Sequence, residues 1–157
     1  MSITKLNNLS ISAVTALPSG VGGKVLQVVT ATSTSSTITT STSYVDVGVS
    51  LSITPSSASS KIFLIATSVN ELNGASKTLD VRILRNSTEI NSASYKEDSS
   101  GTGGKTTGAM NLLDSPSTTS AITYKLQIKS LDGTIIVFNV NASSGNIAVL
   151  TAFEIAG

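Results

Sequence analysis

The chain of 157 residues contains no cysteine, histidine or tryptophan. Without histidine it lacks the base of a Ser-His-Asp or Cys-His site and the imidazole ligand common in metal centres. Without cysteine it has no disulfide framework, thiol nucleophile, zinc knuckle or iron–sulfur ligand. We therefore expect no catalytic residue, no metal site and no cofactor.

Charge is also scarce. Charged residues make up 12% of the chain, about half of the roughly 25% found in ordinary globular domains. The ten basic and nine acidic residues are scattered, and Arg82 and Arg85 are the closest basic pair. Because nucleic-acid binding proteins cluster their cations, no nucleic-acid partner is expected. No apolar run approaches the ~20 residues of a membrane-spanning helix, so no membrane span is expected either.

Serine and threonine are abundant instead, with 28 and 21 copies. From residue 24 onward, apolar and polar residues alternate, and turn residues interrupt the pattern at short intervals. Alternation with period two is typical of β-strands that bury one face. The most hydrophobic segment, residues 61–69 (KIFLIATSV), is predicted to be a central strand.

The same pattern predicts a series of further strands. They are expected at residues 24–31, 32–43 (an exposed Ser/Thr-rich strand), 44–54, 79–84, 89–95, 106–113, 121–128, 134–140 and 147–155. Asn73-Gly74 and residues 85–88 predict turns, and Asp132-Gly133 predicts a hairpin. With about nine or ten short strands and no helix after residue 23, we expect an all-β fold, an antiparallel β-sandwich or jelly roll.

Residues 1–23 differ from this domain, which we place at residues 24–157. Ile3, Leu6, Ser10, Ala13 and Leu17 are spaced alternately by three and four, which fits a short helical seam, but an extended arm fits the Asn, Ser and Thr content as well. Pro18 and the following glycines predict a joint. The residues predicted to anchor the chain through this arm are Leu6, Leu9, Val14 and Leu17.

An ordered set of short segments resembles a known group of proteins. The segments are KVLQVV at 24–29, YVD at 44–46 after the Ser/Thr run, ITPSSASSKI at 53–62, LDSP at 113–116, TYKLQ at 123–127 and LTAFEIAG at 150–157. Together they resemble short virion proteins of tailed bacteriophages, of the fibre, knob and decoration type. The similarity covers residues 18–157.

This resemblance implies a trimeric jelly roll of the tumour-necrosis-factor and C1q type, located in a virion that assembles in the host cytoplasm. The expected function is structural: a homotrimeric tail fibre or receptor-binding knob, held to other phage structural proteins by its arm. Its loops would face the host surface, with a cell-surface glycan as a further partner. A capsid decoration protein or head fibre of the same virion is the alternative.

Loops at one end of the domain are expected to form the distal face, since binding residues concentrate on loops held by a rigid scaffold. The candidate loops are residues 70–77, 96–105 and 114–120. The contact residues predicted in them are Asn73, Tyr95, Lys96, Glu97, Asp98 and Lys105. Tyr95 is the aromatic residue best placed to stack on a sugar.

Two other function classes remain open at this point. A stand-alone carbohydrate-binding module would be a monomer with measurable sugar affinity. An enzyme acting on a surface polymer would need two carboxylates held about 5–10 Å apart across a cleft. Glu97 and Asp98 are adjacent in a glycine-rich loop, which favours a solvated loop over a catalytic pair. We therefore expect the protein not to be an enzyme.

Overall fold

The computed structural model describes residues 24–74, 76–97, 104–139 and 145–157, which form strands and no helix. The predicted arm, residues 1–23, lies outside this part of the chain. The strands are β1 (Val25–Ser33), β2 (Thr37–Thr39), β3 (Val45–Ile53), β4 (Lys61–Leu72), β5 (Lys77–Arg85), β6 (Thr88–Glu97), β7 (Gly104–Asp114), β8 (Ile122–Ser130), β9 (Ile136–Phe138) and β10 (Ala148–Ile155). The all-β expectation is confirmed.

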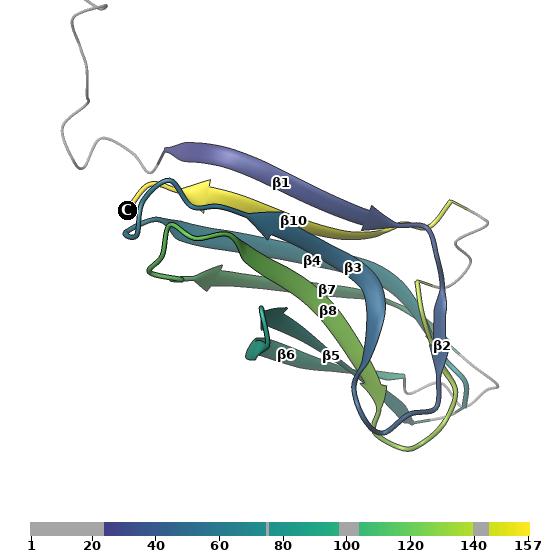
Figure 1. Ribbon diagram of the computed structural model, residues 1–157. Helices are drawn as coiled ribbons and strands as arrows, with labels where there is room; N and C mark the ends of the chain where they lie inside the picture. The colour runs from purple at the N-terminus through teal and green to yellow at the C-terminus, as the bar shows by residue number, and fades with distance from the viewer. Residues whose placement is uncertain (1–23, 75, 98–103, 140–144) are drawn as a thin grey trace, which may run out of the picture.

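The strands form two antiparallel sheets that pack face to face as a β-sandwich (Figure 1). In the six-stranded sheet, β4 is central: it pairs with β7 on one side and with β10 and β9 on the other, while β1 and β2 extend the sheet beyond β10 and β9. The four-stranded sheet has the order β3-β8-β5-β6. The prediction that residues 61–69 form a central strand is confirmed.

Most successive strands lie in different sheets, which is the connectivity of a jelly roll. Only β5 and β6 form a hairpin of adjacent strands within the described residues, turning at Asn86 with φ of 55°. The hairpin predicted at Asp132-Gly133 is wrong, because β8 belongs to the four-stranded sheet and β9 to the six-stranded one. A turn does occur there, since Gly133 has φ of 70°. The residues of a turn, however, do not determine which sheet the following strand joins.

The Ser/Thr run forms less strand than predicted. Of residues 32–43, only the end of β1 and the three residues of β2 are extended and paired. After each of these two strands, a hydroxyl group accepts a hydrogen bond from the backbone N–H two residues ahead: Ser35 N–H donates to Ser33 Oγ at 3.2 Å, and Ser41 N–H donates to Thr39 Oγ1 at 3.0 Å. These local bonds compete with the ladder and interrupt the strand.

The core lies between the two sheets and is built by strict alternation. Along β4, even-numbered residues from Ile62 to Leu72 are buried and odd-numbered ones are partly exposed. The larger buried side chains include Tyr124 and Phe138, both at most 1% exposed. One face of each sheet is therefore buried in the core. The surfaces left for contacts with other molecules include the outward faces of the two sheets.

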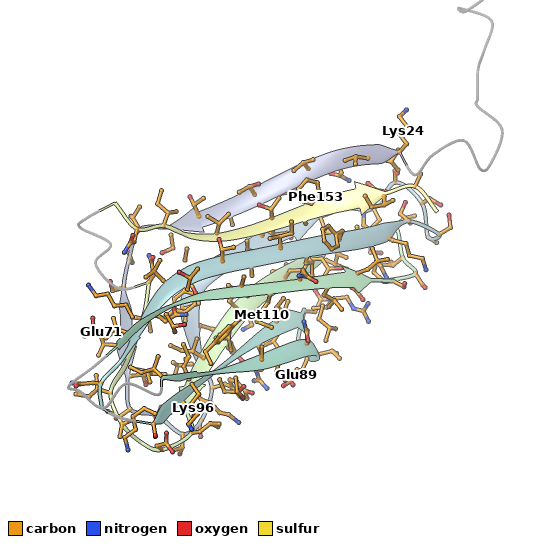
Figure 2. All side chains as sticks on the ribbon, turned by 180° about the vertical axis from the view of Figure 1, so that it is seen from behind. Lys24, Glu71, Glu89, Lys96, Met110 and Phe153 are labelled. Carbon is orange, nitrogen blue, oxygen red and sulfur yellow. The ribbon has the colours of Figure 1, made fainter. Side chains whose placement is uncertain are left out.

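The two ends of the sandwich are distinct (Figures 1 and 2). At one end, which we call the arm end, β1 begins after Lys24 and β10 ends, beside the β3–β4 turn. The opposite end, the loop end, carries the β4–β5 connection and the ends of β6 and β7 that lie beside it. Figure 2 shows Lys24 at the arm end and Glu71 and Lys96 at the loop end.

This arrangement corrects one prediction about the distal face. Of the predicted loop 114–120, Asp114 is the last residue of β7 and pairs with Ile62 at the arm end, and residues 115–120 follow the strand. The β7–β8 loop therefore lies at the opposite end from the β4–β5 connection. The sequence could not show this, because it depends on the direction in which each strand crosses the sandwich.

Candidate functional site

The outward face of the six-stranded sheet is apolar where a solvent-facing sheet would be polar. The antiparallel register places four apolar side chains in one row across β1, β10, β4 and β7: Val28, Phe153, Phe63 and Leu113. The two end members are the most open, with 53% of Val28 and 57% of Leu113 exposed. The rings of Phe63 and Phe153 lie 6.2 Å apart, centroid to centroid, and stiffen the middle of the row.

The apolar surface continues toward the loop end. There, β2 and β9 add Ile38, which is 67% exposed, and its partner Val137. Ile135, just before β9, and Ile147, just before β10, are also exposed, at 44% and 46%. We call this whole surface the outer apolar face; its members are Val28, Ile38, Phe63, Ile65, Val69, Leu113, Val137, Val149 and Phe153.

The remaining positions of this face are short and mostly uncharged. One row across the sheet consists of Thr30, Thr151, Ile65 and Asn111, with the two threonine hydroxyls 3.1 Å apart. Among the described residues of these four strands, the charged side chains of this face lie near its two ends: Lys61 of β4 at the arm end, and Glu71 of β4 opposite Lys105 of β7 at the loop end. Contiguous exposed apolar patches on soluble proteins mark interaction sites.

The outward face of the four-stranded sheet is the opposite in character. Arg82 lies at its centre, and its guanidinium donates hydrogen bonds to Gln127 Oε1 at 2.6 Å and to Glu89 Oε2 at 3.0 Å. Lys129 pairs with Asp80 at 3.5 Å, and Ser94 donates to the same carboxylate at 3.0 Å. Such a connected charged surface is stable in water and costly to dehydrate, so this face suits contact with solvent.

Tyr44 is held within this charged network. The Arg82 guanidinium lies 3.7 Å and the Lys129 ammonium 4.4 Å from the centre of its ring, and its hydroxyl donates to Asp80 at 2.6 Å. Burial and the hydrogen bond to Asp80 raise the pKa of the Tyr44 phenol to about 12. The ring is thus occupied by cations and is not a free platform for a sugar.

The loop end brings together most of the predicted contact residues. Asn73 and Lys105 are exposed there, and Lys96 is exposed near the end of β6, whose last residue is Glu97. Leu72 pairs with Gly104, and Lys77 with Glu97, so these residues share one end of the sandwich. Asp98 lies outside the described residues.

The structure places Tyr95 partly against the core, not on a fully exposed loop. Its ring packs against the core, and its hydroxyl donates to the carbonyl oxygen of Ala109 at 2.9 Å. Burial raises the pKa of the phenol. The reason is register: Tyr95 pairs with Leu79, and both side chains point into the sandwich. The hydrogen bond to Ala109 ties β6 to β7, and the ring is left only partly exposed.

At the arm end, the structure reveals a buried carboxylate that sequence reasoning missed. Glu154 is fully buried. It accepts hydrogen bonds from the Ser56 backbone N–H and hydroxyl, both at 2.7 Å, and from Gln27 Nε2 at 2.6 Å. The signal in the sequence was its parity: Leu150, Ala152 and Glu154 occupy the same alternating face of β10.

The environment of Glu154 keeps it ionised. Burial alone would raise the pKa of this carboxyl, but the hydrogen bonds from Ser56 and Gln27 outweigh it and hold the pKa at about 2. Because Gln27 belongs to β1 and Ser56 to the β3–β4 turn, one side chain joins three segments. The backbone N–H of Ala156 adds a bond to the Lys24 carbonyl at 2.9 Å. These contacts hold the backbone at Lys24, where the described part of the chain begins.

The predicted anchoring residues Leu6, Leu9, Val14 and Leu17 all lie outside the described residues. Among the residues that the structure does describe, no three acidic side chains gather into a metal-binding cluster. No helix long and apolar enough to cross a membrane occurs in that same part of the chain.

Comparison with models of known protein families finds no match. Comparison with curated proteins finds none either.

Proposed function

We propose that this protein is a non-enzymatic structural component of a tailed-phage virion: a homotrimeric fibre or knob, attached through residues 1–23. The observation that carries the proposal is the outer apolar face, whose members are exposed at Val28, Ile38 and Leu113 and partly exposed elsewhere in the single chain. The ordered segments that resemble phage virion proteins add the biological setting. The jelly-roll fold agrees with the type that this resemblance implies.

A second and third copy of the chain are the occupants that suit the outer apolar face best. Burying a fully exposed Leu or Val side chain stabilises an assembly by about 1.5–3 kcal/mol, and Val28 and Leu113, at 53% and 57% exposed, would each contribute about half of that. The face is nearly free of charge in its middle, so little desolvation cost opposes its burial. The charged outward face of the four-stranded sheet would remain in solvent on the outside of the assembly.

Cyclic symmetry also fits the two ends of the sandwich. Rotation about an axis along the strands places every arm end on one side of the assembly and every loop end on the other. Residues 1–23 of the three copies would then reach the particle together. Asn73, Lys96 and Lys105 of the three copies would face away from it, toward the host surface.

The mass in solution provides the first test. The intact chain of 16.0 kDa should give about 48 kDa by light scattering coupled to size-exclusion chromatography, as expected for a closed trimer. A mass of one chain, unchanged over a wide range of protein concentration, would contradict the trimer and favour the stand-alone carbohydrate-binding module.

Removal of the arm provides the second test. Deleting residues 1–20 should leave a folded domain, because the two sheets and the Glu154 contacts begin after residue 23. The same deletion should abolish incorporation into virions, measured as the amount of the protein that co-purifies with particles. Incorporation at the undeleted level would contradict the anchoring role, and loss of the fold would place residues 1–20 in the domain.

Tail and capsid locations predict different images of the particle. Labelled copies only at the tail would support the fibre or receptor-binding knob, whereas copies over the head would support the capsid decoration or head fibre. Both outcomes retain the proposed assembly, since the arm anchors the trimer in either location.

A further inference from the structure

An irregularity in β3 opens a small cavity in the outward face of the four-stranded sheet. Asp46 pairs with Gln127 and Ser50 with Lys125, so three residues of β3 lie opposite one residue of β8. Such a bulge leaves the extra residues out of the ladder. At its apex, Gly48 adopts φ of 71°, and open space surrounds the position of a Cβ atom there. A glycine inside an alternating strand was the signal in the sequence.

The cavity has a volume of about 120 Å³ and an amphipathic lining. Asp46, Ser50 and Lys125 supply polar groups, and Gly48, Val49 and Leu126 complete the lining. The side chains of Val49 and Leu126 are only 1% and 2% exposed and point into the core. The Lys125 ammonium lies 3.2 Å from the Asp46 carboxylate, so the two charges balance.

The polar groups are already oriented. Gln127 Nε2 donates to Asp46 Oδ1 at 2.7 Å, and this hydrogen bond is the main reason that the pKa of the Asp46 carboxyl is lowered. The carboxylate is therefore ionised at neutral pH and keeps further lone pairs for a ligand, since its side chain is 60% exposed.

We propose that this cavity, which we call the bulge cavity, binds one sugar residue of a cell-surface polysaccharide. An anion would meet the carboxylate of Asp46, and a cation would meet the ammonium of Lys125, so a neutral ligand fits best. A sugar offers hydroxyl groups that both donate to a carboxylate and accept from an ammonium. It also offers C–H groups for an apolar lining.

This inference rests on the proposed function, because the trimer leaves the bulge cavity on its outside. A shallow site of this size supports weak binding to one sugar, with a dissociation constant on the order of 1 mM. Three copies in one trimer can bind a repeating polymer together, which raises the overall affinity by about 10²- to 10⁴-fold without any new contact. Reversible weak contacts of this kind suit attachment to a host surface.

Titration with simple sugars tests the bulge cavity directly. Glucose, galactose, mannose, rhamnose and N-acetylglucosamine are added singly to the ¹⁵N-labelled full chain, up to about 50 mM, well above the expected dissociation constant. We expect at least one of them to produce saturable amide shifts at residues 47–50 and 125–126. Saturable shifts confined to Asn73, Lys96 and Lys105, or no saturable shift with any of the five sugars, would overturn the proposal.

Two pairs of variants separate the cavity from its surroundings. Asp46→Asn removes the carboxylate and should weaken sugar binding at least about ten-fold, because hydrogen bonds to a charged group are strong. Ser50→Ile fills the cavity with a larger side chain, and it should weaken sugar binding by at least as much because the sugar no longer fits. Glu89→Gln removes a charge elsewhere on the same face, and Ser52→Ile adds the same bulk one outward position farther along β3. These controls should stay within about two-fold of the unmodified chain. Equal weakening in the controls would overturn the assignment.

The same samples distinguish this proposal from the proposed function. A mass of about 48 kDa without sugar binding would overturn the bulge cavity alone and leave the trimer standing. A mass of one chain with saturable binding at residues 47–50 would overturn the trimer and leave the cavity as the site of a monomeric carbohydrate-binding module. Dispersed amide spectra of all four variants verify that each one is folded.

Discussion

Replacing Phe63 with glutamate should turn the proposed trimer into a 16.0 kDa monomer. Phe63 lies in the middle of the outer apolar face, between Phe153 and Leu113. In a trimer, Phe63→Glu would bury three carboxylates without partners, at a cost of several kcal/mol per ion. The loss of three aromatic contacts adds to this cost. We expect the association to weaken by well over about 100-fold, measured as mass against protein concentration by light scattering.

A matched substitution on the other sheet is the control. Ser92 is exposed on the outward face of the four-stranded sheet, opposite Arg82. Ser92→Glu introduces the same charge, and the mass should remain about 48 kDa, since this face stays in solvent in the proposed trimer. A Phe63→Glu protein that is folded by circular dichroism and still trimeric would show that another surface joins the copies.

Substitution of Glu154 should have the second large effect, on stability. In Glu154→Gln, the amide presents an N–H₂ group to donors that now converge on a carboxylate, including the Ser56 N–H and the Gln27 amide. Leaving buried donors unsatisfied costs about 1–3 kcal/mol each, and more where a charged partner is lost. We expect the free energy of unfolding at pH 7 to fall by about 2–4 kcal/mol, measured by urea denaturation at one fixed protein concentration.

Acid should remove the contribution of Glu154 to the free energy of unfolding from the unmodified protein as well. The pKa of Glu154 is about 2 in the folded chain, against an ordinary value of 4.5. A lowered pKa means that the folded state holds the proton less tightly than the unfolded state. The stabilisation is therefore complete above pH 4.5 and is lost as the pH falls toward 2. The shift corresponds to about 3–4 kcal/mol at about 1.4 kcal/mol per pH unit.

The acid limb of the stability curve supplies the control. Glu154→Gln should flatten the fall in stability between pH 4.5 and 2, whereas Glu71→Gln, at the loop end of β4, should leave it unchanged. An equally steep fall in the Glu154→Gln protein would show that other carboxyl groups cause the acid sensitivity. In that case the hydrogen bonds to Glu154 would contribute far less than their short distances suggest.

Much of the strand content could be read along the chain. Alternation in residues 49–53 and 121–128 identified β3 and β8, and the apolar run at 61–69 identified the centre of β4. Side chains alternate between the two faces of a strand from one residue to the next. This pattern involves only neighbouring residues, so a single sequence is enough to reveal it. The Ser/Thr run misled because its composition favours strands while its hydroxyls bond the neighbouring backbone.

The candidate sites depended on pairings that the sequence does not display. Glu154 had an inward parity in β10, but its donors, Gln27 and Ser56, are distant in the chain and meet it only through packing. Gly48 marked an irregularity, yet the bulge cavity exists because β8 passes beside it with two residues fewer. Tyr95 stood next to a polar loop in the sequence and lies against the core in the structure.

What the residues alone established is the all-β class and the poverty in reactive groups. These follow from composition and from a period-two pattern, both of which act over a few neighbouring residues. Tertiary structure decided which strand joins which sheet, which loops share an end, and that one outward face is apolar while the other is charged. The alternation within a strand shows that the side chains on one of its faces are buried and those on the other are not. Which exposed side chains lie next to each other across the sheet depends on the register between strands.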